Sequence, residues 1–201
     1  MNNNTKYIGI TGKSGSGKSY IANQLAQKLD ATLFSFDDFS HLSLETDTLK
    51  NFALAEFGES VFDDGKINRK KIGIIAFANT EKLEKWNKLA EAEMEKLIDL
   101  KLKSTHSKYV IFEYALLPLM KYFDMCHLKI LVTAESKNRA LRVCTRDNIG
   151  ARYFETRDAH SPEFDNFKFD AIIDNSKNDS SALDELEKFI KENLWLEKQQ
   201  L

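Results

Sequence analysis

The sequence is poor in the residues on which secreted, metal-bound and membrane proteins depend. Its 201 residues include only two cysteines, Cys126 and Cys144. Two cysteines are too few for a disulfide framework, and their spacing matches no paired metal site, which fits a reducing cytosol. No apolar run approaches the roughly 18 residues of a membrane span, and the polar segment 1–6 lacks the apolar core of a signal peptide. We therefore expect a cytoplasmic protein that does not bind a membrane.

The sequence also lacks an excess of either charge. Lysine and arginine number 29 against 31 acids, which gives a net charge of -2. No basic surplus is available to neutralise a nucleic-acid backbone, so we expect no nucleic-acid partner. At 42% hydrophobic residues, the length suits one globular domain with a small insertion. We expect a monomer or a weak homo-oligomer.

What is present is a complete phosphate-binding motif. Residues 12–19 read G-K-S-G-S-G-K-S, which fits G-x-x-x-x-G-K-[ST]. The glycines allow backbone N–H groups to surround phosphate oxygens, Lys18 reaches the β and γ phosphates, and the Ser19 hydroxyl can bind Mg²⁺. An apolar run at 7–10 precedes the loop, and a helical pattern over 19–29 follows it. The motif predicts a nucleoside triphosphate site formed by Gly12, Ser14, Gly15, Ser16, Gly17, Lys18, Ser19 and Tyr20.

Short apolar runs alternate with helical patterns along the chain. The runs lie at 7–10, 32–36, 109–112, 128–132 and 171–173. This alternation predicts an α/β fold, a P-loop NTPase-type three-layer sandwich with a five-stranded parallel sheet.

The interval at about 41–107 shows helical patterns and no convincing strand, so it predicts a helical insertion in a single domain of residues 1–201. Within it, Asn68 is expected to cap a helix over 69–77 and Thr80 a helix over 81–103.

Acidic residues end the second and third apolar runs. Ligands of open parallel sheets bind beyond the carboxyl ends of the strands, so these acids are candidates for function. Asp37 can accept a proton from an attacking hydroxyl or help to hold a metal, and the alternative is a helix cap. Glu113 occupies the place of a Walker-B carboxylate and would hold Mg²⁺, and the alternative is a structural acid.

Arginines are dense near the end of the chain, at Arg139, Arg142, Arg146, Arg152 and Arg157. The first three share one helical face, and the last two lie in a predicted loop that can close over phosphates. The planar guanidinium suits phosphate, although some of these side chains are expected only to be solvated. We predict an arginine-rich lid at about 142–162. Its segment 148–162 shows no apolar stripe, so we expect that segment to be mobile without ligands.

Taken in this order, the residues resemble those of dephospho-CoA kinases over about 8–194. The family's strand and loop are matched by 10–19, and its Asp-x-x-x-His pattern by Asp37 and His41. Its insert is matched by 57–61, 64–69 and Phe77. Further matches are Glu113 to Leu117, Arg142, Arg146, Arg157 and Asn175.

The resemblance implies phosphorylation of the ribose 3′-hydroxyl of dephospho-CoA, the last step of coenzyme A synthesis, with ATP as donor and Mg²⁺ as cofactor. It implies that Asp37 is the base, that Lys18, Arg142 and Arg146 act in catalysis, and that Arg157 and Asn175 bind ATP. The implied acceptor-binding residues are Asp37, His41, Arg69, Phe77, Glu113 and Leu116, and the implied metal ligands are Ser19 and Glu113. Departures from the family pattern occur at Ser35, Glu91, Ala92, Glu113, Ala115 and Ser161.

Two other functions share some of these features. A nucleoside or nucleoside-monophosphate kinase has the same loop, acid and lid, but lacks the insert segment. A GTP-driven switch, or an inactive binding module, is the alternative outside enzymes. It is suggested by Asp147 to Gly150, with D-x-x-G spacing, and by Ser176 to Asp179, which resembles the guanine-reading [NT]-K-x-D.

Overall fold

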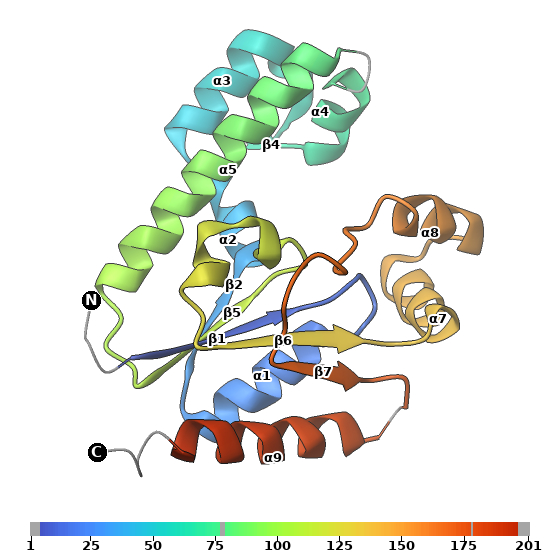
Figure 1. Ribbon diagram of the computed structural model, residues 1–201. Helices are drawn as coiled ribbons and strands as arrows, with labels where there is room; N and C mark the ends of the chain where they lie inside the picture. The colour runs from blue at the N-terminus through green and yellow to red at the C-terminus, as the bar shows by residue number, and fades with distance from the viewer. Residues whose placement is uncertain (1–4, 77–78, 178, 197–201) are drawn as a thin grey trace. The chain divides into compact units, whose positions relative to one another are not determined.

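The computed structural model describes residues 5–76, 79–177 and 179–196 (Figure 1). The chain divides into two compact units. The smaller comprises residues 35–105, and the larger comprises the segments before and after them. No helix in the described ranges is long and apolar enough to cross a bilayer.

The larger unit is built on a five-stranded sheet. Its strand order is β2-β5-β1-β6-β7, and β1 pairs in parallel with β5 and β6, as β6 does with β7. The five predicted apolar runs are these five strands, so the predicted α/β fold with a parallel sheet is confirmed. The strands are β1 (Lys6–Thr11), β2 (Thr32–Ser35), β5 (Tyr109–Glu113), β6 (Leu128–Thr133) and β7 (Ala171–Asp174).

Alternate residues of the central strand face two different layers. Ile8 and Ile10 pack against helices α1 (Lys18–Leu29) and α9 (Ser181–Leu196), which lie on one face of the sheet in Figure 1. On the other face, Tyr7 stacks on Phe112 with ring centroids 5.4 Å apart. Burial of both faces explains why the strands read as apolar runs rather than as an alternating pattern.

The second face of the sheet is closed by a short irregular segment. It contains η2 (Leu117–Leu119) and α6 (Lys121–Asp124). Cys126 is buried there, and a Cβ added to Gly9 would come 2.8 Å from its Sγ atom. Burial raises the pKa of the Cys126 thiol to about 12. Cys126 is therefore a core residue.

Two further helices follow β6. They are α7 (Ser136–Asp147) and α8 (Ala151–Asp158), joined by a left-handed Asn148. Phe154 of α8 is only 3% exposed, and the Arg139 guanidinium lies 5.7 Å from its ring centroid. The segment predicted to have no apolar anchor therefore has one. A single residue gives no periodic pattern, so this anchor was not visible in the sequence.

The smaller unit is mostly helical. An aromatic cluster of Phe52, Phe57 and Trp86 joins two of its helices, and Leu49 and Ile72 are among the other residues of its core. Its elements are α2 (Phe36–Ser43), α3 (Asp47–Phe57), η1 (Glu59–Val61), β3 (Phe62–Asp63), β4 (Lys66–Ile67), α4 (Arg69–Ala76) and α5 (Thr80–Lys103).

Two predictions for this unit need correction. The absence of a strand is wrong, because β3 and β4 form an antiparallel hairpin. Its turn residues Asp64 and Gly65 have φ of 47° and 73°, so an Asp-Gly pair that is a strong hairpin signal was overlooked. The cap of α5 is Asn79, which accepts from the N–H of Lys82 at 3.1 Å, and not Thr80.

The cap predicted for α4 is confirmed. The Asn68 side chain accepts from the N–H groups of Lys70 and Lys71, at 2.9 and 3.2 Å. Phe77, the last residue of that predicted helix, lies outside the described residues.

Candidate active site

The phosphate loop joins β1 to α1 in a conformation that only glycine tolerates. Gly15 and Gly17 have φ of 79° and 89°. A Cβ at Gly15 would lie 2.6 Å from the Arg139 carbonyl oxygen, and one at Gly17 would lie 2.1 Å from Nδ2 of Asn175. The loop is thus packed closely against α7 and against the turn after β7, and both contacts exclude a side chain.

Three of the predicted residues meet at the inner end of this loop. Glu113 ends β5 opposite Ile10 of β1, which brings its carboxylate to the start of α1. The Ser19 hydroxyl donates to Glu113 Oε1 at 3.0 Å, and Lys18 Nζ lies 3.8 Å from the same oxygen. Glu113 is 2% exposed, and a carboxylate buried to this degree requires such partners. The cluster places a cation, a hydroxyl and an acid where a bound triphosphate would end.

The same cluster suits a magnesium ion. Ser19 and Glu113 offer two hard oxygen ligands 3.0 Å apart. The described residues contain no group of three or more histidine, cysteine or acidic side chains that could hold a metal. Because Mg²⁺ commonly takes one or two protein oxygens and fills its remaining positions with phosphate and water, this small ligand set fits it.

The outer side of the loop is held by side chains from elsewhere in the chain. Arg142 donates to the carbonyl oxygens of Gly15 at 3.2 Å, Ser16 at 3.4 Å and Asn175 at 2.8 Å. Asn175 in turn donates from Nδ2 to the Ser16 carbonyl at 2.8 Å. The Ser16 hydroxyl is buried and has no hydrogen-bond partner among the described residues. Two residues predicted to act on ATP therefore contact the loop backbone.

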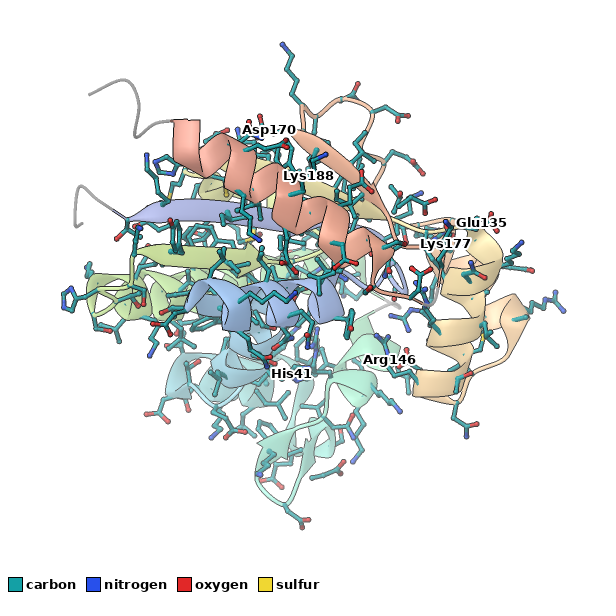
Figure 2. All side chains as sticks on the ribbon, turned by 90° about the horizontal axis from the view of Figure 1, so that it is seen from below. His41, Glu135, Arg146, Asp170, Lys177 and Lys188 are labelled. Carbon is teal, nitrogen blue, oxygen red and sulfur yellow. The ribbon has the colours of Figure 1, made fainter. Side chains whose placement is uncertain are left out.

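Two other predicted arginines lie on the exposed side of α7 and α8. Arg146, labelled in Figure 2, donates a hydrogen bond from Nε to Oδ1 of Asp147 at 2.7 Å. Nη1 of Arg157 lies 3.8 Å from Oδ2 of the same carboxylate. The two arginine side chains are 63% and 55% exposed. Hydrogen bonds from Arg146 lower the pKa of Asp147, and the charge of Arg157 adds to the shift. Their roles toward ATP stay predictions.

The remaining nucleotide and acceptor residues predicted in the larger unit differ in exposure and in contacts. Tyr20 is on the exposed face of α1, and Leu116 is partly exposed just before η2. Gly12 begins the loop, and Ser14 offers its carbonyl oxygen to Arg139 at 3.3 Å. No sequence signal distinguished Arg139 from its neighbours, and its contact with the loop was missed.

Several predicted acceptor residues lie in the smaller unit. Asp37 is exposed in the first turn of α2, whose cap is Ser35, so the alternative interpretation of Asp37 as the cap is wrong. His41 and Arg69 line one cavity of about 480 Å³. The cavity is also lined by Leu44, Asp63, Lys66, Ile67, Asn68 and Lys70.

Fold and site together define a class of protein. A parallel sheet whose first strand leads through a phosphate loop into a helix, with a strand-end carboxylate beside the loop lysine and serine, is the arrangement of a P-loop NTPase.

Comparison with known proteins narrows this class to a family. Residues 6–181 match the family model of dephospho-CoA kinases. The dephospho-CoA kinase of Fusobacterium nucleatum is 30% identical over 186 residues, covering 90% of this chain and 95% of that one. That of Dehalococcoides mccartyi is 27% identical, covering 85% and 88%. The chain belongs to the dephospho-CoA kinase family, and its function is that of a dephospho-CoA kinase.

Solved structures agree with the fold. The structure of TT1252 from Thermus thermophilus matches with a TM-score of 0.80 at 21% identity, covering 96% of this chain and 99% of that one. A dephospho-CoA kinase from Campylobacter jejuni matches with a TM-score of 0.59 at 20% identity, covering 94% and 97%. At these identities the likeness concerns the fold alone.

Proposed function

We propose that this kinase transfers the γ-phosphoryl group of ATP to the ribose 3′-hydroxyl of dephospho-CoA and releases coenzyme A and ADP. The observation that supports it most is the cluster of Lys18, Ser19 and Glu113 beside the phosphate loop. In the reaction the 3′-oxygen forms a bond to the γ-phosphorus, the bond to the β,γ-bridging oxygen breaks, and ADP leaves with that oxygen.

The loop and Lys18 supply the charge stabilisation. Phosphoryl transfer requires little covalent help from a protein, so positioned N–H groups and a cation account for much of the catalysis. Lys18 is buried, and the Glu113 carboxylate 3.8 Å from its Nζ helps to orient the ammonium group before ATP binds. Ser19 and Glu113 would hold Mg²⁺, which when bound neutralises charge on the β and γ oxygens.

Asp37 is proposed as the base that takes the proton of the 3′-hydroxyl. Its carboxylate is exposed in the first turn of α2, and no ion pair engages it among the residues that the structure describes. A carboxylate left accessible in this way can accept a proton from a substrate hydroxyl.

The acceptor contacts are proposed for His41, Arg69, Phe77, Glu113 and Leu116. The shared cavity of His41 and Arg69 supports the first two, because the basic side chains around it suit a phosphorylated acceptor. Arg142, Arg146 and Arg157 are proposed to meet the phosphates when ligands are bound, and Asn175 and Tyr20 to lie near the nucleotide. Arg142, Arg146 and Arg157 belong to the proposed lid at about 142–162. His41, Arg69 and Phe77 belong to the proposed substrate-binding insertion at about 41–107 of one kinase domain.

An acceptor panel tests the function. ADP release is measured with dephospho-CoA, a set of nucleosides and a set of nucleoside monophosphates, at equal concentrations with ATP and Mg²⁺. We expect ADP release only with dephospho-CoA, with one 3′-phosphorylated product per ADP by mass spectrometry. Turnover with a nucleoside or its monophosphate, and none with dephospho-CoA, would support the other kinase class instead.

The switch alternative has little support. Asp147 is the last residue of helix α7, whereas a switch aspartate follows a strand. The second motif includes Asn178, which lies outside the described residues. Equal binding of ATP and GTP analogues without turnover would revive this alternative.

We also propose that the protein acts in the cytoplasm as a monomer or weak homo-oligomer. Its two free cysteines support a reducing compartment. Sedimentation over a range of concentrations measures the oligomeric state.

A further inference from the structure

Three successive carbonyl groups of the phosphate loop accept hydrogen bonds from arginines of α7. Arg139 Nη1 donates to the carbonyl of Ser14 at 3.3 Å. One turn further along, Arg142 Nη1 donates to the carbonyls of Gly15 at 3.2 Å and Ser16 at 3.4 Å. The outer edge of the loop is therefore fastened to one face of this helix.

Fastening the carbonyls affects the N–H groups that bind phosphate. Each peptide unit is planar, with its C=O and N–H pointing in opposite directions. A donor that holds a carbonyl on the outside of the loop therefore turns the N–H of the same unit toward the inside. A phosphate loop binds phosphate through those N–H groups. The hydrogen bonds to the outer carbonyls therefore determine whether the inner N–H groups point toward the phosphate.

Arg139 is itself fixed by a second residue. Its Nη1 and Nη2 donate to the two carboxylate oxygens of Asp158 at 2.5 and 2.6 Å. Arg139 is 7% exposed, and its guanidinium also lies against the Phe154 ring of α8. Bidentate pairing of this kind fixes both the position and the plane of the guanidinium. These hydrogen bonds also lower the pKa of Asp158, so the acid stays ionised in this pair.

We propose that Arg139 is a positioning residue of the triphosphate site and that Asp158 holds it in this role. Arg139 shapes the loop through the Ser14 carbonyl and does not contact the phosphates. Through the ion pair, the end of helix α8 is tied to the loop, so the docking of α8 and the affinity for nucleotide are coupled. The proposal rests on the proposed use of the loop as the ATP site.

The alternative is that Arg139 binds phosphate directly, as a lid arginine. The two roles predict opposite signs for one substitution. Asp158→Asn removes the charge that engages the guanidinium. A phosphate-binding arginine would be released by this change, and nucleotide affinity would be kept or improved. A positioning arginine would lose its support, and nucleotide affinity would fall.

Calorimetric titration of the full-length protein with ADP and with a non-hydrolysable ATP analogue, each with Mg²⁺, measures this directly. We expect Asp158→Asn and Arg139→Gln each to weaken both nucleotides by about tenfold, the size of one hydrogen bond to a charged group. The KM for dephospho-CoA should change by no more than about twofold, since no acceptor contact is removed. The double variant should resemble Arg139→Gln alone, because Asp158 acts through that residue.

Matched controls come from the start of the same helix. Lys137 and Glu135, the latter labelled in Figure 2, form an exposed ion pair at 2.8 Å. Glu135→Gln and Lys137→Gln remove an acidic and a basic charge, as Asp158→Asn and Arg139→Gln do, but at the N-terminal end of α7 and without touching the phosphate loop. Exposed pairs contribute little, so both variants should bind nucleotide like the wild type.

Arg139→Lys keeps the charge, but a lysine lacks the planar fork that donates to the Ser14 carbonyl and to both carboxylate oxygens of Asp158 at once. We expect it to bind nucleotide as weakly as Arg139→Gln, and it replaces that variant if Gln prevents folding. Unchanged or tighter nucleotide binding in Asp158→Asn, or full recovery in Arg139→Lys, would overturn the proposal. If the wild type binds nucleotide but does not phosphorylate dephospho-CoA, the proposed function fails while this test still applies.

Discussion

Lys18 Nζ lies 3.8 Å from the buried carboxylate of Glu113, and its charge is proposed to stabilise the γ-phosphoryl group during transfer. Lys18→Met keeps the apolar stem and removes only the ammonium group. We expect kcat to fall at least about 10²-fold, the usual loss when one electrostatic donor of a preorganised site is deleted. Steady-state ADP release measures the loss, and circular dichroism checks the fold. A rate within about tenfold of wild type would contradict the role assigned to this side chain.

Asp37 and Glu113 differ sharply in burial, and their substitutions should differ in effect. Asp37→Asn should lower kcat by about 10²- to 10⁴-fold, with nucleotide affinity unchanged, because it removes only the proposed base. Glu113→Gln should instead raise the Mg²⁺ concentration that gives half-maximal activity, since it removes one of two proposed metal ligands. Metal titrations of both variants separate the two roles. An unchanged Mg²⁺ requirement in Glu113→Gln would show that Glu113 is a structural acid for Lys18 and Ser19.

At the scale of elements, two glycines of the smaller unit should respond in opposite directions to alanine. Gly65 holds a left-handed conformation, with φ of 73°, in the turn of the β3–β4 hairpin, and Gly65→Ala should destabilise the protein by about 1 kcal/mol. Gly73 lies in helix α4, where an added Cβ would meet no atom within 4 Å, so Gly73→Ala should stabilise the protein by about 0.5–1 kcal/mol. Thermal unfolding of both variants gives the comparison. A gain in stability from Gly65→Ala would show that the hairpin turn is wrongly described.

Helix α8 should remain docked until the pH falls well into the acid range. The pKa of Asp158 is lowered chiefly by hydrogen bonds from Arg139, and the charge of Lys13, itself paired with Glu163 at 2.8 Å, adds to this. A lowered folded-state pKa gives stability that is complete above the unfolded value of about 3.9 and is lost as the pH falls through the folded value. We expect hydrogen-exchange protection of α8, corrected for intrinsic rate, to be constant from about pH 7 to 5 and to fall below about pH 4.

In Asp158→Asn this acid-induced change should be absent, with protection low at every pH. Protection of α8 that varies between pH 5 and 7 in the wild type would point to a different titrating group. Buried Phe154 and the ion pair between Arg139 and Asp158 favour a docked α8. Protection of the whole proposed lid by bound ligands stays a prediction.

For the whole molecule, bound nucleotide should raise thermal stability by mass action. At about one hundred times its Kd, ATP with Mg²⁺ should add about 2.7 kcal/mol to the free energy of unfolding. For a chain of this length that corresponds to an increase in Tm of several degrees. A smaller increase is expected with GTP at the same concentration and with ATP in the Lys18→Met variant. A larger increase with GTP would contradict the assignment of the site to ATP.

The features that the sequence determined by itself are contiguous motifs and regular patterns of apolar residues. The phosphate loop is contiguous, so residues 12–19 predict its chemistry without any knowledge of the fold. Strands buried on both faces read as apolar runs, and each of the five was found. Glu113 could be placed beside Ser19, although the two lie 94 positions apart, because carboxyl ends of parallel strands meet at one edge of the sheet.

The tertiary structure alone decided which arginines touch the loop. Arg139, Arg142 and Arg146 share a helical spacing and a charge, and the sequence does not say which way α7 turns when it packs. Packing directs Arg139 and Arg142 to the loop carbonyls, while Arg146 pairs with Asp147 at the exposed surface. Arg139 can pair with Asp158 only because helix α8 packs close to α7, and Phe154 is the residue of α8 that is buried. Contacts of this kind depend on how the helices pack against the loop and against each other. Neither the spacing of residues along the sequence nor its composition determines that packing.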